Sequence, residues 1–234
     1  MPHTVIEKGK QSFKWEAPFE LHKTGQRNHS NPLFVYLHGY RQNNILFRKK
    51  MENILGLNGY HLFIQGPYPL PTRDRPIEEW GAAWYTYDGD QQKFANSLEH
   101  TAKYIDDLLT TIKTNYEIEK TALIGYSMGG YQAGYYALSR FEKVDYLVVL
   151  SARIKTELFE TSLDKMKGLN ILAVHGQRDK SVKEAPQRKE IEKLKNHGVS
   201  ASLKRVEAGH RLDEKITSKM VDWLLEKGFI QQDE

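Results

Sequence analysis

The chain has 234 residues, a length that suits one α/β domain, and we predict a single domain over residues 1–234. Hydrophobic residues at 39% and aromatic residues at 11% exclude a disordered chain, and the absence of cysteine excludes disulfides, thiolate metal sites and a cysteine nucleophile. The net charge is +4, with acidic and basic residues mixed along the chain, so no nucleic-acid-binding surface is indicated.

The N-terminal segment contains no apolar stretch of the kind found in signal peptides. Apolar runs elsewhere are far shorter than the roughly 20 residues that a membrane helix needs. We therefore expect a cytoplasmic protein with no membrane span.

The first thirty residues contain three short strand-like segments, at 4–8, 12–15 and 19–22, separated by turn-like or proline-containing stretches. They are predicted to be antiparallel edge strands. Residues 26–32, Q-R-N-H-S-N-P, have the composition of a loop.

Short apolar runs of strand length then recur along the chain. They are continuous rather than alternating, which is typical of parallel strands buried on both faces. These runs are residues 33–37, 62–64, 122–124, 146–150 and 171–174.

Helical patterns lie between these runs. Apolar residues at helical spacing predict helices over 94–112 and 212–225, the latter ended by Gly228, and a weaker pattern covers 185–194. Strands alternating with helices predict an α/β fold, a mostly parallel sheet with helices on both faces. Residues 65–90 show neither period, and we interpret them as a long, aromatic-rich loop that is too short to form a separate cap domain.

The strongest local motif is G-Y-S-M-G-G at residues 125–130, between a predicted strand and a predicted helix over 131–140. This context is typical of a nucleophile elbow, a sharp turn that presents a serine at a helix N-terminus. Ser127 is the candidate nucleophile, and the Met128 N–H is a candidate oxyanion donor. The alternative is a glycine-rich turn that binds phosphate or only caps the helix.

A nucleophilic serine needs a base, and three of the nine histidines follow it in the sequence. His210 lies in a loop after the strand-like run 201–206, where a base is expected. His197 lies beside Gly198 at a predicted helix end, and His175 ends a buried strand, so both are interpreted as structural.

The candidate acid is Asp179, which follows the strand 171–174 by a short turn. Asp145 begins a strand and so lies at the wrong edge of the sheet, and Asp164 has no strand before it. The alternative role for Asp179 is that of a helix N-cap residue.

The strand at 33–37 is followed by His38, Gly39, Tyr40 and Arg41. The Tyr40 N–H is the candidate for the second oxyanion donor, and a plain turn is the alternative. His38 and His175 each end a strand, but without a third ligand they indicate a structural pair rather than a metal site. No phosphate-binding loop or dinucleotide motif is present, so we expect no metal and no cofactor.

These motifs together resemble the α/β-hydrolase superfamily and, within it, the phospholipase/carboxylesterase family, which includes the acyl-protein thioesterases. The similarity covers residues 32–223. It rests on the L-H-G strand end at 35–39, a tryptophan segment at 81–88, the elbow at 125–130, L-S-A at 150–152, H-G-Q-R-D within 174–182, and G-H at 209–210.

The resemblance implies that Ser127 is the nucleophile, Asp179 the acid and His210 the base, with oxyanion N–H groups from Tyr40 and Met128. It implies a mostly parallel sheet between helices and cleavage of carboxylic esters or thioesters without a cofactor. The sequence departs from the family where Arg41 replaces a second glycine, where Lys183 replaces a proline, and over residues 66–76.

The substrate is expected to be a small-molecule ester. Arg41, Trp84 and Tyr87 are candidate substrate contacts. The positive charges of Arg41, Arg73 and Arg75 favour a substrate with an anionic leaving group. The alternative is that these three arginines are ordinary surface charges. The aromatic residues either line an acyl or aryl pocket or pack the core.

The sequence therefore predicts a serine carboxylesterase that works through an acyl-enzyme. The alternatives are a catalytically silent ligand-binding relative, or an acyltransferase or peptidase with the same triad.

Overall fold

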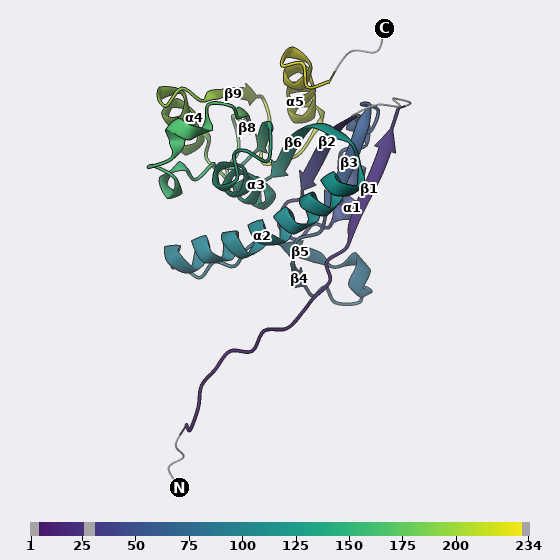
Figure 1. The fold of residues 1–234 in the computed structure, drawn as a ribbon, viewed down its shortest axis with the longest axis vertical. Coiled ribbons are helices and arrows are strands. Elements are labelled where there is room, and N and C mark those ends of the chain that lie inside the picture. The colour runs from purple at the N-terminus through teal and green to yellow at the C-terminus, as the bar shows by residue number, and fades with distance from the viewer. Residues whose placement is uncertain (1–4, 26–30, 231–234) are drawn as a thin grey trace.

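The computed structural model describes residues 5–25 and 31–230. In these residues a central sheet has seven strands in the order β1-β3-β2-β6-β7-β8-β9, and it is parallel except for β1, which pairs antiparallel with β3 (Figure 1). This confirms the predicted mostly parallel sheet. The strands are β1 (Phe19–Thr24), β2 (Asn31–Leu37), β3 (Gly59–Ile64), β6 (Ile118–Tyr126), β7 (Tyr146–Leu150), β8 (Asn170–Gly176) and β9 (Ser200–Val206).

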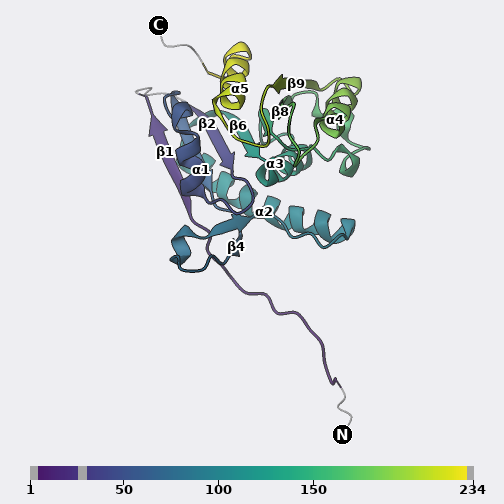
Figure 2. The same cartoon turned by 180° about the vertical axis from the view of Figure 1, so that it is seen from behind.

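Helices cover both faces of this sheet (Figures 1 and 2). On one face α2, α3 and α4 pack over one hydrophobic cluster, and on the other α1 and α5 pack over a second. No helix in the described part of the chain is both long and apolar enough to cross a membrane. The helices are α1 (Asn44–Lys50), α2 (Gln91–Asn115), α3 (Met128–Ser139), α4 (Glu184–Asn196) and α5 (Glu214–Glu226).

Burial on both faces explains why the strands are continuous apolar runs. Successive side chains of a strand point to opposite faces. In β2, Val35 and Leu37 belong to the cluster under α2 and α3, while Phe34 and Tyr36 belong to the cluster under α1 and α5. All four are fully buried. An exposed face would instead have required alternating polar residues.

The long helices begin and end at residues suited to capping. The Asp90 carboxylate accepts hydrogen bonds from the N–H groups of Gln92 and Lys93 at 2.8 and 3.0 Å and so starts α2. Gly228 follows α5 with a φ of +65°, as expected for the glycine predicted to end that helix.

The N-terminal strands are predicted correctly only in part. β1 is an antiparallel edge strand, but residues 5–18 form no strand, so the strand predicted at 12–15 is wrong, as is the described part of the one at 4–8. The segment runs away from the body of the molecule (Figure 1), and Phe13 is 86% exposed. Its alternating pattern suits a strand, but no neighbouring strand supplies hydrogen bonds. Residues 26–30 of the predicted loop lie outside the described residues, and Asn31 and Pro32 begin β2.

The predicted loop at 65–90 contains regular structure that the sequence did not reveal. β4 (Tyr68–Leu70) pairs antiparallel with β5 (Gly81–Ala83), which corrects the prediction there. Each strand has three residues, too few to show a period. β5 also reaches the loop after β2, because the Arg41 N–H donates to the Ala82 carbonyl at 3.1 Å and the Ala82 N–H donates to the Gln42 carbonyl at 2.8 Å.

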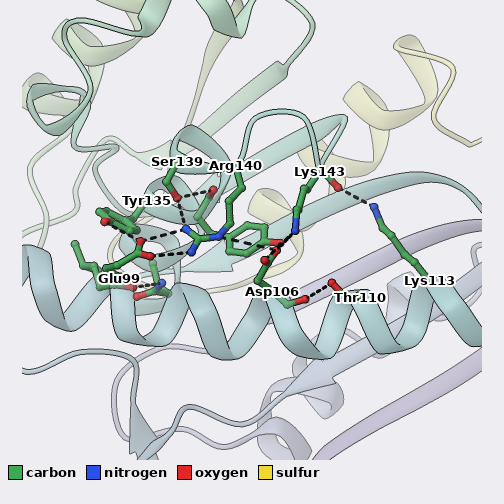
Figure 3. Close-up of polar contacts among 11 residues, drawn as sticks. Glu99, Asp106, Thr110, Lys113, Tyr135, Ser139, Arg140 and Lys143 are labelled. Atoms are coloured by element: carbon green, nitrogen blue, oxygen red, sulfur yellow. Dashed lines mark hydrogen bonds and ion pairs between the residues drawn. The ribbon is translucent and has the colours of Figure 1, made fainter.

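A charged network joins α2 to the C-terminal end of α3 (Figure 3). The Arg140 guanidinium donates to both carboxylate oxygens of Glu99, at 2.9 and 3.2 Å, and its Nε lies 3.9 Å from Asp106. Lys143 and the Tyr136 hydroxyl also donate to Asp106. Hydrogen bonds from Arg140 hold the pKa of Glu99 below its usual value. The network fixes the helix that follows the G-Y-S-M-G-G turn against its neighbour.

Arg140→Met is expected to lower the free energy of unfolding by about 1.5–3 kcal/mol, because it removes charged hydrogen bonds from a half-buried carboxylate. Since the pKa of folded Glu99 lies below the unfolded value of about 4.3, this stabilisation is complete above that pH and is lost as the pH falls through the folded value. Urea unfolding at neutral and acidic pH measures both effects. Arg73→Met, at an arginine side chain that is 95% exposed, is the control and is expected to change stability by less than about 0.5 kcal/mol.

Candidate active site

Ser127 lies in the tight turn between β6 and α3, with φ 51° and ψ −117°. This left-handed conformation is unfavourable for a residue with a side chain. The turn can close because Gly125 and Gly129, which flank it, have no side chains. A Cβ on Gly125 would lie 2.3 Å from the Gly129 carbonyl oxygen, and a Cβ on Gly129 would lie 2.3 Å from the Leu37 carbonyl oxygen. Both glycines of G-x-S-x-G are therefore required, because a larger residue at either position would clash with the backbone.

The three residues predicted as a triad lie in one hydrogen-bonded chain. The Ser127 Oγ is 2.9 Å from His210 Nε2, and His210 Nδ1 is 2.7 Å from Asp179 Oδ2. The Asp179 side chain is fully buried, and its Oδ1 accepts the N–H groups of Ser181 and Val182, each at 2.9 Å. A carboxylate that accepts from Nδ1 selects the imidazole tautomer whose Nε2 can accept the serine proton.

The fold brings Asp179 and His210 together because both follow the carboxyl ends of adjacent strands. Asp179 follows β8 and His210 follows β9. The Arg178 N–H donates to the Ala208 carbonyl at 2.9 Å, and a Cβ on Gly176 would lie 2.5 Å from that oxygen. The two loops are thus in backbone contact just before the acid and the base.

The two predicted oxyanion donors lie at the ends of neighbouring strands, β2 and β6. Residues 39–42 form a hydrogen-bonded turn in which Arg41 has a φ of 61°, the pattern of a type II turn. Within residues 5–25 and 31–230, neither the Tyr40 N–H nor the Met128 N–H donates to a protein acceptor. Gly129 packs against the Leu37 and His38 carbonyls, so this turn lies against the start of α3.

The competing acids and bases have structural partners. Asp145 accepts the Thr121 N–H at 2.8 Å, and Asp164 pairs with His197 at 2.8 Å on the surface. His175 is buried, and its Nε2 lies 2.7 Å from the Val182 carbonyl oxygen and 3.6 Å from Asp179 Oδ2, so it packs against the candidate acid.

The predicted pairing of His38 with His175 is wrong. β6 and β7 lie between the strands that carry them, an order that the sequence does not reveal. Burial lowers the pKa of His38 to about 4, and the neutral ring accepts the Gly66 N–H at 3.0 Å. Among the described residues, no three histidine, aspartate or glutamate side chains form a group able to hold a metal ion.

The candidate substrate contacts differ in exposure. Trp84 is fully buried, and its indole N–H donates to the His38 carbonyl at 2.7 Å, so it supports the end of β2 rather than lining an open surface. Tyr87 is 59% exposed and lines a cavity beside α3. The Arg41 side chain is exposed at the turn that carries the Tyr40 N–H.

Sequence reasoning missed two residues of this region. The Tyr126 ring packs against the His210 ring, with centroids 5.6 Å apart, and its hydroxyl donates to the His210 carbonyl at 3.3 Å. Its place directly before Ser127 was a usable signal. Lys155 lies in the cavity that Tyr87 lines, and nothing in its local sequence marked it.

Comparison with known proteins places this geometry in a family. The family model described as phospholipase/carboxylesterase matches residues 23–226. A search of curated protein sequences gives no significant match. Solved structures of similar fold include the esterase PE8, with 18% identity, a TM-score of 0.71 and coverage of 90% of this chain and 98% of that one.

Two further structures give the same result. The Mesorhizobium loti carboxylesterase has 16% identity and a TM-score of 0.70, over 89% of this chain and 94% of that one. The Zea mays acyl-protein thioesterase 2 has 20% identity and a TM-score of 0.68, over 88% and 98%. At these identities the likeness establishes the fold.

Gly129→Ala tests the spatial requirement of the turn. The new methyl group would meet the Leu37 and His38 carbonyl oxygens at 2.3 and 2.5 Å, so we expect a loss of about 1–3 kcal/mol in unfolding free energy. Gly134→Ala in the same helix is the control. There the nearest atom is 3.5 Å from the added methyl group, and we expect a gain of about 0.5–1 kcal/mol. Equal effects in chemical denaturation would contradict the argument.

Proposed function

The chain belongs to the phospholipase/carboxylesterase family, and from this premise we propose that it is a serine hydrolase that cleaves carboxylic esters through Ser127, His210 and Asp179. The observation that supports this most is the continuous hydrogen-bonded chain from the Ser127 Oγ to the buried Asp179 carboxylate. A strained serine at a helix N-terminus, with a base at 2.9 Å, has the geometry of an activated nucleophile.

In the proposed reaction the Ser127 Oγ attacks the ester carbonyl while His210 Nε2 takes its proton. The carbonyl oxygen becomes an oxyanion, which the N–H groups of Tyr40 and Met128 stabilise. Collapse of the tetrahedral intermediate breaks the bond between the acyl carbon and the leaving-group oxygen. His210 gives the proton to this leaving-group oxygen. Asp179 keeps the imidazole in the productive tautomer and stabilises the imidazolium.

Water then completes the cycle. His210 takes a proton from a water molecule, which attacks the acyl-enzyme, and the second tetrahedral intermediate releases the acid and regenerates Ser127. A thioester would follow the same steps with a thiol as leaving group. An acyltransferase would replace this water with another alcohol, and a catalytically silent relative would not form the acyl-enzyme.

The triad is tested by labelling with a fluorophosphonate, located by mass spectrometry, and by hydrolysis of a short para-nitrophenyl ester. We expect the label on Ser127. Ser127→Ala and His210→Ala are each expected to lower kcat by at least about a thousandfold, because members of a triad act as a unit.

His197→Ala is the matched control for this test. His197 also pairs with an aspartate at 2.8 Å, but on the surface, and its loss is expected to leave kcat unchanged. A folded wild-type protein that takes no label, or a Ser127→Ala variant that keeps more than about a tenth of the activity, would refute the assignment.

The Tyr40 N–H can be removed without changing the turn. Tyr40 is the second residue of a type II turn, a position that accepts proline, and proline has no N–H. Tyr40→Pro is expected to lower kcat about 100- to 1,000-fold relative to Tyr40→Ala, which loses the same ring but keeps the N–H. Equal kcat values for the two variants, with unchanged melting temperatures, would exclude Tyr40 as an oxyanion donor.

A further inference from the structure

A cavity of about 270 Å³ lies against α3, the helix that begins at the proposed nucleophile, on the face of the sheet covered by α2 and α3. Its volume is below the roughly 300–1,000 Å³ of sites for drug-sized ligands, so it suits one short arm of a molecule rather than a long acyl chain. The cavity is lined by Tyr85, Tyr87, Gln91, Phe94, Tyr131 and Lys155.

Two of the walls connect this cavity directly to the candidate active site. Tyr131 lies one helical turn after Ser127, and its N–H donates to the Ser127 carbonyl at 3.2 Å. Tyr85 follows Trp84, whose indole donates to the carbonyl of His38 at the end of β2. The cavity therefore lies between the helix of the elbow, the segment that follows β5 and the start of α2.

The position of His210 indicates which part of an ester substrate would enter the cavity. His210 packs against Tyr126, which belongs to the hydrophobic cluster under α1 and α5. Tyr85 and Tyr131 instead pack against the cluster under α2 and α3. Because the base must reach the leaving-group oxygen, the leaving group lies on the side of His210, and the acyl arm extends away from it, toward the cavity.

Lys155 is the one positively charged residue among the described residues that line the cavity. Its side chain is 15% exposed, and its ammonium lies 5.0 Å from the centroid of the Phe94 ring. Its oxygen partners in the described residues are Gln91 Oε1 at 3.4 Å and Glu157 Oε1 at 3.3 Å. Glu157 also binds Arg153 through its other oxygen, at 2.9 Å, so one carboxylate is shared by two cations. An ammonium has three donors, and one remains for a ligand.

The phenols add neutral donors to the same space. Burial raises the pKa of Tyr131 and of Tyr85, so both hydroxyls keep their protons. The Tyr87 hydroxyl accepts from Gln91 at 2.8 Å, which leaves its own proton available. An ammonium with phenolic O–H groups at the edge of an apolar cavity is suited to an anionic group on a short carbon chain.

We propose that this cavity holds the acyl arm of the substrate and that Lys155 selects acyl groups that end in a carboxylate. The inference rests on the proposed function, because it assigns one part of an ester to a place beside Ser127. It makes Lys155 a residue that determines specificity and leaves the chemical steps to the triad.

The test compares two esters matched in acyl length, the mono-para-nitrophenyl ester of adipic acid and para-nitrophenyl hexanoate. In Lys155→Met, the ratio of kcat/KM for the adipate ester to that for the hexanoate ester is expected to fall about 10- to 100-fold, through KM, because a charge-assisted hydrogen bond is lost. Lys155→Arg is expected to keep most of the preference. Lys93→Met, at an exposed lysine of α2 paired with Asp88, is the control and is expected to leave both esters unchanged.

The outcomes separate this inference from the proposed function. Failure of fluorophosphonate labelling at Ser127 would remove the proposed function. Normal labelling with an unchanged adipate-to-hexanoate ratio in Lys155→Met would overturn this inference alone. A third ester, para-carboxyphenyl hexanoate, carries its negative charge on the leaving group. If Lys155→Met lowers kcat/KM for this ester alone, the assignment of the cavity to the acyl arm is overturned.

Discussion

Backbone contact at the carboxyl edge of the sheet is the constraint on which the candidate site depends. Gly129 presses the start of α3 against the Leu37 and His38 carbonyls, and Gly176 presses the loop after β8 against the loop after β9. The first contact sets the elbow beside the end of β2, and the second sets the carboxylate beside the imidazole. Neither leaves room for a methyl group, so the geometry around Ser127 rests on main chain rather than on adjustable side chains.

The two hydrophobic clusters divide the region around Ser127. The imidazole of His210 lies over Tyr126, whose ring belongs to the cluster under α1 and α5. The aromatic cavity lies over the other cluster, with Tyr131 in its wall. A sheet buried on both faces thus presents two different environments at one strand end. In the proposed reaction the leaving group and the acyl arm occupy these two sides.

The sequence predicted the candidate site better than its surroundings, for a physical reason. Ser127, Asp179 and His210 each follow a strand, and parallel strands end at one edge, so chain order was enough to bring them together. The false pairing of His38 with His175 needed the order of strands across the sheet, which depends on crossovers that no local pattern records. The strand expected at 12–15 has a suitable pattern but no neighbour to bind.

Residues 65–90 show neither a helical nor a strand period, and most of the features around the site that the sequence did not predict lie in this segment or contact it. Arg41 takes a left-handed conformation, which is unfavourable for a residue with a side chain, and the hydrogen bonds between β5 and this turn at Ala82 hold it there. Trp84 supports the end of β2, and Tyr85 and Tyr87 line the cavity. One short stretch of chain, residues 81–87, therefore contacts the turn that carries the Tyr40 N–H and also supplies two of the residues that line the cavity. A change in this stretch that alters acyl selectivity is expected to alter the oxyanion turn as well, because β5 connects the two.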